Sequence, residues 1–184
     1  MIWIYGGSFN PPTKAHFNII NSVKNKFPKD QVYIIPVGDQ YKKKDLEPFN
    51  HRVNMLLEMD KNYNILKYEK EIYEGTYHTL LKVKKDFKCK VGFIIGSDLL
   101  INIPEWIEYK KLCDQFPVII IKRPKYDIIP EEHLRIFKNY KVINLNLEIS
   151  SKKIRNNMKN LSNNLHPNVL KYIKKNLLYE VKNV

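Results

Sequence analysis

One segment constrains the fold more than any other, residues 6–16, which read Gly-Gly-Ser-Phe-Asn-Pro-Pro-Thr-Lys-Ala-His. The apolar run before it, residues 1–5, has the length of a buried parallel strand. Two prolines exclude both a helix and a paired strand inside the segment. From Thr13 the apolar residues follow a helical period until about residue 27. The pattern predicts a strand, a glycine-rich turn and a helix, an arrangement that presents backbone N–H groups to a phosphate.

The rest of the chain alternates short apolar runs with amphipathic stretches, as α/β proteins do. Strands are predicted near residues 31–36, 63–68, 90–95, 116–121 and 142–147, and helices near 51–59, 76–87, 131–137 and from about residue 150. No internal repeat, linker or low-complexity run divides the sequence. We therefore expect one domain, residues 1–184, with a Rossmann-like, doubly wound parallel sheet.

Lysine accounts for most of the positive charge. The formal net charge is +13, yet only four of the 32 basic residues are arginine. Outside enzymes, the alternative is a basic nucleic-acid-binding module, which would place Lys and Arg on one face among aromatic residues. The sequence shows no such clustering beyond the stretches described below. We therefore expect lysines on solvated helix faces and no nucleic-acid partner.

The sequence also bounds location and redox chemistry. No stretch approaches the roughly 18 apolar residues of a membrane span, and the apolar start is too short for a signal peptide. Cys89 and Cys113 lack the spacing of a metal site, so we expect free thiols. We predict a cytoplasmic protein with no membrane partner, and the oligomeric state stays open, a homo-oligomer included.

Three further polar stretches bear on function. Two follow predicted strands, where open α/β sheets bind ligands: the lysine triplet at 42–44 and Gly96-Ser97-Asp98. The third places Ser150 and Ser151 before Arg155, a helix start with a bidentate phosphate donor one turn along. The residues alone leave an alternative open for each stretch. The lysine triplet can be a solvated loop, Asp98 an ordinary N-cap, and the stretch from Ser150 to Arg155 a capped basic helix.

Residues 6–16 resemble the N-terminal motif of the nucleotidylyltransferases, small α/β enzymes that join a nucleotide to a phosphorylated substrate. The family motif ends in His-x-x-His or Thr-x-x-His, and Thr13 and His16 match the second form, with Ala15 where many members have glycine. The chain is similar in particular to nicotinate/nicotinamide mononucleotide adenylyltransferases. That likeness covers nearly the whole chain, including Pro-Val-Gly-Asp-Gln-Tyr-Lys-Lys-Lys at 36–44, Ile-Ser-Ser-x-x-Ile-Arg at 149–155 and a C-terminal helical stretch at 165–179.

The resemblance implies a step of NAD biosynthesis, in which the AMP part of ATP joins nicotinate or nicotinamide mononucleotide and pyrophosphate leaves. It implies a catalytic set of Thr13, His16, Lys43 (with Lys42 as second choice) and Arg155. The ATP side is assigned to Gly7, Ser8, Phe9, Asn10, Gly96, Asp98, Ser150, Ser151 and Arg155, and the pyridine mononucleotide side to Arg52, Thr79, Trp106 and Arg123. Mg²⁺ is expected to arrive on the ATP phosphates, with no metal ligands from the protein.

Related enzymes are the alternatives. Pantetheine-phosphate adenylyltransferases share the Thr-x-x-His form, and cytidylyltransferases belong to the same superfamily. The lysine triplet, His51-Arg52, Trp106 and the Ile-Ser-Ser stretch favour the pyridine nucleotide enzyme. Class I aminoacyl-tRNA synthetases use related motifs, but we expect 184 residues to leave no room for an anticodon-binding domain. The sequence does not separate nicotinate from nicotinamide mononucleotide, and we expect structural or surface roles for His78 and His166.

Overall fold

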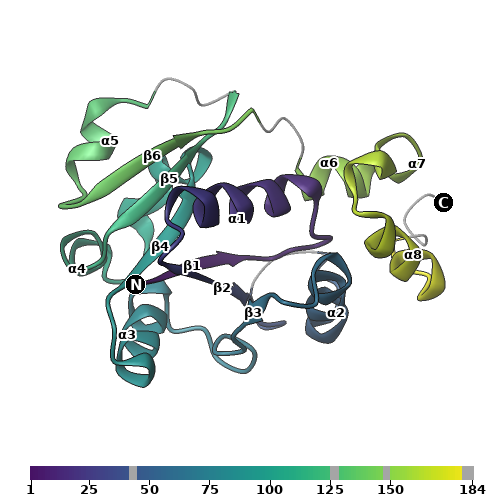
Figure 1. The fold of residues 1–184 in the computed structure, drawn as a ribbon, viewed down its shortest axis with the longest axis horizontal. Helices are drawn as coiled ribbons and strands as arrows, with labels where there is room; N and C mark the ends of the chain where they lie inside the picture. The colour runs from purple at the N-terminus through teal and green to yellow at the C-terminus, as the bar shows by residue number, and fades with distance from the viewer. Residues whose placement is uncertain (42–44, 125–128, 147–149, 180–184) are drawn as a thin grey trace.

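A computed structural model describes residues 1–41, 45–124, 129–146 and 150–179. Six parallel strands form one sheet in the order β3-β2-β1-β4-β5-β6 (Figure 1). Their bounds are β1 (Ile2–Gly7), β2 (Gln31–Pro36), β3 (Asn64–Ile65), β4 (Val91–Gly96), β5 (Val118–Lys122) and β6 (Tyr140–Asn144). Because β1 pairs with both β2 and β4, the sheet grows outward from the first strand in two directions. The predicted Rossmann-like, doubly wound parallel sheet is confirmed.

Helices cover both faces of the sheet. Those described are α1 (Lys14–Lys26), α2 (Phe49–Met59), α3 (Thr76–Phe87), α4 (Tyr109–Gln115), α5 (Glu131–Arg135), α6 (Ser151–Asn156), α7 (Met158–Leu161) and α8 (Pro167–Lys175), with 3-10 turns η1 (Ser97–Glu105) and η3 (Ser162–Asn164). Strand residues alternate between two cores. Trp3 and Tyr5 pack in the core that holds the buried residues of α1, α2, α6 and α8. Ile2 and Ile4 pack in the other core, with α3, α4 and η1.

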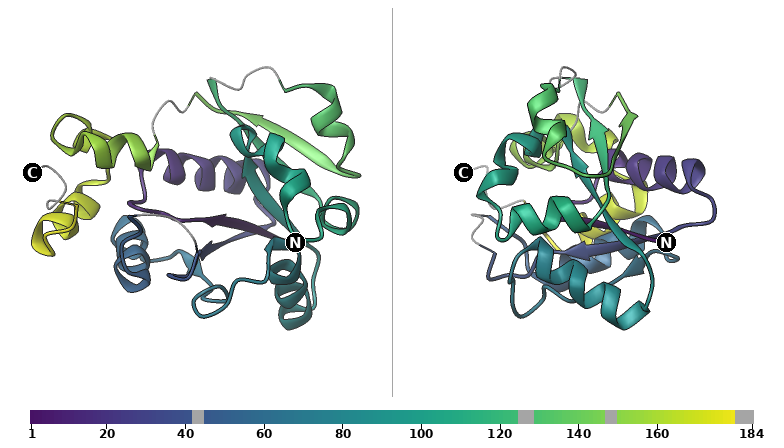
Figure 2. Two further views of the ribbon diagram at one scale, coloured as in Figure 1. Left: turned by 180° about the vertical axis from the view of Figure 1, so that it is seen from behind. Right: turned by 90° about the vertical axis from the view of Figure 1, so that its left-hand side faces the viewer.

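The last helices lie at one end of the sheet. Seen from behind, α6, α7 and α8 gather at the end where α1 begins, away from the N-terminus (Figure 2). Val169 and Ile173 of α8 are buried in the same core as Met55 and Leu56 of α2. The hydroxyl of Tyr172 accepts from Asn54 Nδ2 at 3.0 Å, which joins α8 to α2. The C-terminal helices therefore pack beside the loops that follow β1 and β2.

The structure adjusts several predicted boundaries. Helix α2 begins at Phe49, two residues early, and β6 begins at Tyr140. The N-cap of α3 is Gly75 rather than Thr76, with φ +99°, a backbone conformation that favours glycine. Neither α4 nor η1 was predicted, because a seven-residue helix and a 3-10 turn give too few apolar repeats to establish a period.

Gly92 should be needed for the contact between the two central strands. It pairs with Trp3, and a Cβ there would lie 2.4 Å from Trp3 Cζ3 and 2.6 Å from the Pro117 carbonyl oxygen. We expect Gly92→Ala to lower the free energy of unfolding by about 1–3 kcal/mol in urea titrations, because the added methyl overpacks the core. Gly6→Ala is the control, since its Cβ would meet nothing nearer than 4.0 Å. Equal effects of the two changes would contradict this packing.

Candidate active site

The first turn of α1 orients His16. The backbone N–H of Thr13, the N-cap residue, donates to His16 Nδ1 at 2.9 Å, and Thr13 Oγ1 lies 3.0 Å from the same nitrogen. A ring nitrogen that accepts from an amide carries no proton, so the neutral imidazole holds its proton on Nε2. The turn thus leaves His16 with one hydrogen-bond donor, Nε2–H, next to the N-terminal N–H groups of a 13-residue helix.

The environment keeps His16 neutral. Its ring packs edge-on against Phe9, with centroids 5.1 Å apart, and lies 6.1 Å from the ring of Tyr5. Burial, and to a lesser extent the positive charge of Arg123, lower the pKa of His16 to about 3. Before any ligand binds, His16 is therefore a neutral donor at physiological pH rather than a cation.

The side chains of Phe9 and Asn10 support the loop after β1 from inside. Phe9 is 1% exposed, has φ +47° and packs against Tyr5. Asn10 is also 1% exposed, and its side-chain amide forms hydrogen bonds with the backbone of Asp45 and Glu47 in the loop after β2. Both side chains have partners within the protein, and a contact of either residue with ATP stays a prediction.

Arg52 forms its hydrogen bonds inside the protein. Its side chain is fully buried and donates to the carbonyl oxygens of Ser8, Val37 and Glu47 at 3.1, 2.8 and 2.7 Å. It also forms an ion pair with Asp39 at 2.9 Å. Arg52 therefore ties the loop after β1 to the loop after β2, and its assignment to the pyridine mononucleotide side stays a prediction.

The end of β4 supplies a carboxylate beside an arginine. Asp98 Oδ2 accepts from Arg123 at 3.0 Å, while Asp98 Oδ1 and Arg123 Nε are buried without a partner among the described residues. A Cβ on Gly96 would lie 2.3 Å from Asp98 Oδ1, so only glycine allows this placement. The charge of Arg123 contributes to the lowered pKa of His16, so the two residues share one electrostatic environment, and a contact of Arg123 with the pyridine mononucleotide stays a prediction.

A small cleft of about 110 Å³ opens next to this pair, between η1 and α5. Its lining residues are Ser97, Asp98, Leu100, Ile101, Ile129, Pro130 and His133. The cleft therefore opens beside Asp98, and its walls are mainly apolar.

The start of α6 joins the same group. Ser150 caps the helix by accepting from the Lys153 N–H at 3.3 Å, as predicted. Ser151 Oγ donates to the Pro11 carbonyl oxygen at 2.8 Å, and Arg155 donates to the Asn10 carbonyl oxygen. Residues 140 or more positions apart in the sequence therefore meet at the loop before α1.

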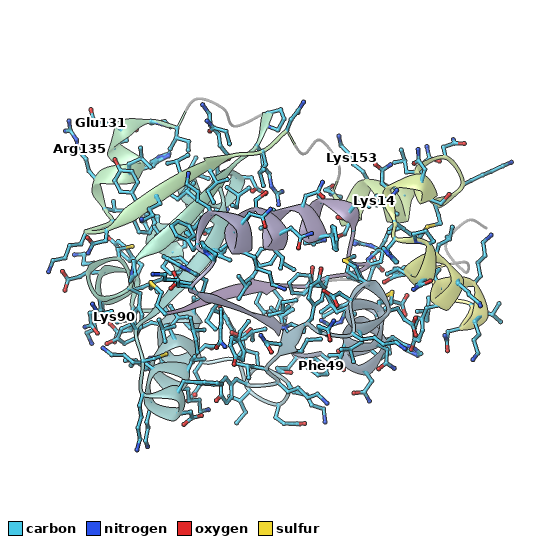
Figure 3. The ribbon with its side chains drawn as sticks, viewed as in Figure 1. Lys14, Phe49, Lys90, Glu131, Arg135 and Lys153 are labelled. Carbon is cyan, nitrogen blue, oxygen red and sulfur yellow. The ribbon has the colours of Figure 1, made fainter. Side chains whose placement is uncertain are left out.

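Exposed cations surround this junction. Lys14 opens α1 and Lys153 lies in α6, and both are labelled at the same end of the molecule (Figure 3). Both are exposed, and Lys152 next to Lys153 is exposed too. The predicted catalytic residue Lys43 and its alternative Lys42 lie outside the described residues. The described lysines add positive potential where two helices begin.

Two residues predicted for the pyridine side, Thr79 and Trp106, belong to other elements. Thr79 is buried in α3, where its hydroxyl donates to Glu69 Oε1 at 2.9 Å. Trp106 is half-buried against the core formed by α3 and α4. The structure thus gives Thr79 an internal partner, and a ligand contact of either residue stays a prediction.

Sequence reasoning missed Glu69. This side chain is 6% exposed, and Gln40 Nε2 donates to its backbone oxygen at 3.1 Å. Burial raises the pKa of its carboxyl to about 7, and the hydrogen bond from Thr79 only partly opposes the shift. A glutamate in a polar stretch carries no signal of burial, because its surroundings come from a different part of the chain.

The fold and the site define a Rossmann-like α/β domain whose grouped polar residues follow the carboxyl ends of its parallel strands. A family model described as Cytidylyltransferase-like matches residues 4–157, and the chain belongs to this family.

A relative from Acholeplasma laidlawii, called a probable nicotinate-nucleotide adenylyltransferase, is 32% identical and covers 98% of each chain. A solved structure of a Plasmodium falciparum nicotinic acid mononucleotide adenylyltransferase complexed with NaAD has TM-score 0.83, 28% identity and 97% coverage of each chain. A second, complexed with APC, has TM-score 0.80 and 29% identity, with 97% and 96% coverage. The predicted family resemblance is confirmed.

The described residues contain no metal-binding cluster and no membrane helix. No group of three or more His, Cys, Asp or Glu side chains gathers among them in a way that could hold a metal ion. Within the same residues, no helix is long and apolar enough to cross a bilayer. The acidic group of the site, Asp98, is already paired with Arg123.

The buried carboxyl of Glu69 should make stability fall with rising pH. Between its unfolded pKa, near 4.5, and about 7, the unfolded chain releases a proton that the folded chain keeps. We expect Glu69→Gln to remove a loss of up to about 3 kcal/mol between pH 5 and pH 8, as measured by urea unfolding at each pH. Glu71→Gln, at an exposed position, is the control. Parallel stability curves for the wild type and Glu69→Gln would show that the carboxyl does not titrate in this range.

Proposed function

We propose that this protein is an adenylyltransferase that joins the AMP part of ATP to nicotinate mononucleotide and releases pyrophosphate, a step in NAD biosynthesis. The observation that carries the proposal is the junction of its two phosphate motifs, where Ser151 and Arg155 bond to the loop that leads to His16. Relatives with the same architecture, matched over almost their full length, support the reaction class.

The reaction needs little from the protein beyond position and charge. A phosphate oxygen of the mononucleotide attacks the α-phosphorus of ATP, and the bond from that phosphorus to the β-phosphate oxygen breaks. The electron pair leaves with pyrophosphate. Because the nucleophile is already anionic near neutral pH, no general base is required. Catalysis then consists of alignment and stabilisation of charge in the transition state.

His16 suits this chemistry as a neutral donor. Its Nδ1 is bonded to Thr13, so it cannot act as a base, and its Nε2–H can donate to an oxygen of the α- or β-phosphate. The N–H groups at the start of α1 add donors, and Arg155 with Ser150 and Ser151 would hold the departing pyrophosphate. Asp98 Oδ1, without a partner among the described residues, would accept from a ribose hydroxyl.

The substrates follow from the relatives. The Plasmodium enzyme is complexed with NaAD, an observation that favours nicotinate over nicotinamide mononucleotide as the second substrate. Thr79 and Trp106 are proposed for the pyridine side, and Lys43 for the phosphates. Magnesium is proposed to enter as the ATP complex, since the described residues offer no carboxylate cluster for a resident ion. A cytoplasmic location is proposed from the sequence, and the oligomeric state stays open.

One assay tests the function. Pyrophosphate release from ATP and Mg²⁺ is measured with nicotinate mononucleotide, nicotinamide mononucleotide and phosphopantetheine as separate acceptors. We expect the highest kcat/KM with nicotinate mononucleotide and no release with phosphopantetheine. If only phosphopantetheine supports release, the protein belongs with the pantetheine-phosphate enzymes. If none of the three acceptors supports release, the protein is not an adenylyltransferase of this kind.

His16→Ala should lower kcat at least about a hundredfold. The change removes a donor to charge that develops in the transition state, a loss on the order of 3–4 kcal/mol by analogy with an oxyanion-hole donor. Circular dichroism should show that the variant is folded. His166→Asn is the control, because His166 caps α8, asparagine is also a good N-cap, and the proposed mechanism gives His166 no role. Near-normal turnover by His16→Ala would remove His16 from the mechanism.

A further inference from the structure

The side-chain amide of Asn10 is the meeting point of three segments. Its Nδ2 donates to the Asp45 carbonyl oxygen at 2.7 Å, and its Oδ1 accepts from the Glu47 N–H at 3.2 Å. The same Oδ1 accepts from the hydroxyl of Tyr179 at 2.7 Å. Because Asp45 requires the NH₂ end of the amide, while Glu47 and Tyr179 require its oxygen, these contacts determine its orientation.

Tyr179 comes from the chain after α8 and reaches Asn10 through an unusual backbone. Leu177 and Tyr179 have φ +52° and +65°, in the left-handed region that residues with side chains rarely adopt. Two such residues in a three-residue stretch persist only where surrounding contacts hold them. Tyr179 is 7% exposed, and burial raises the pKa of its hydroxyl, which therefore stays protonated and donates.

The contact reaches the candidate active site in two ways. The carbonyl oxygen of Asn10 accepts from Arg155, so the residue that meets Tyr179 also holds α6. Pro11 and Pro12 then lead directly to Thr13, whose N–H orients His16. The two prolines have little backbone freedom, so a shift of Asn10 passes to the start of α1.

We propose that Tyr179 is a positioning residue for the phosphate-binding segment, acting through the amide of Asn10. The inference deepens the proposed function and rests on it, because the segment that Tyr179 holds is the one assigned to ATP. The hydroxyl of Tyr179 closes the C-terminal segment onto residues 8–13 and holds His16 and Arg155 in register with each other.

The chain offers a matched control in Tyr172. Its hydroxyl also joins the C-terminal helices to the rest of the protein, through His51 Nδ1 at 2.9 Å and Asn54 Nδ2 at 3.0 Å. Those partners lie in α2 rather than in the loop after β1. Tyr179→Phe and Tyr172→Phe each remove one oxygen atom from a C-terminal contact, and only the first touches Asn10.

The test compares the steady-state kinetics of the two variants. We expect Tyr179→Phe to lower kcat about tenfold, the factor that corresponds to one ordinary buried hydrogen bond, with KM for the mononucleotide within twofold of wild type. Tyr172→Phe should leave kcat within twofold. In an Asn10→Ala background, Tyr179→Phe should lower kcat no further, because the acceptor of its hydroxyl is already gone. Equal kcat for wild type and Tyr179→Phe would overturn the proposal.

A second readout separates this proposal from the proposed function. The ¹⁵N-labelled imidazole of His16 is followed by NMR without substrate, and Tyr179→Phe should shift its Nε2–H resonance while Tyr172→Phe does not. If the wild type releases no pyrophosphate with any acceptor, the proposed function fails and this resonance alone decides the structural claim. An unchanged His16 resonance in Tyr179→Phe would then overturn it.

Discussion

The candidate site depends on one set of contacts, the hydrogen bonds of the buried Arg52 guanidinium. The guanidinium lies between the loops after β1 and β2 and satisfies three carbonyl oxygens from them, at Ser8, Val37 and Glu47. Loops with several inward-facing carbonyl oxygens need a buried donor, since an unpaired carbonyl is costly. The cost of burying the charge is offset by four hydrogen bonds, one of them to Asp39. The arginine thereby fixes the two loops relative to each other.

The active-site chemistry follows from what these loops hold in place. Next to the Arg52 contacts, Asn10 joins the same two loops to Tyr179 and, through its carbonyl oxygen, to Arg155. The loop continues into α1, where Thr13 sets the tautomer of His16. Under the proposed function, a polyanion at this point would meet a neutral donor, a helix N-terminus and arginine, which together would favour charge leaving with pyrophosphate.

The sequence predicts the strands, helices and caps of this site better than it predicts the long-range contacts between them. The strand before residue 6, the helix after Thr13 and the cap at Ser150 were predictable, because they depend on local periodicity and on turn chemistry. The motifs also singled out His16 and Arg155, whose catalytic roles stay predictions. They could not reveal that Phe9 and Asn10 face inward, because in an irregular loop the side that faces the core depends on distant packing.

Long-range partners are what the sequence cannot show. Arg52 matches a substrate-binding position by resemblance, and only the structure shows carbonyl oxygens converging on it from the two neighbouring loops. Arg123 follows a strand two positions from β1 in the sheet, so its proximity to His16 depends on strand order. The burial of Glu69 beside Thr79 likewise comes from the packing of α3 against a loop.

The central claim is that the start of α1 and the start of α6 hold one ATP triphosphate between them. A crystal structure with a non-hydrolysable ATP analogue and Mg²⁺ tests it most directly. The account predicts His16 Nε2 within about 3 Å of an α- or β-phosphate oxygen, and Arg155 or Ser151 on the phosphates beyond it. A triphosphate bound elsewhere, or one that contacts only one of the two helix starts, would contradict the account.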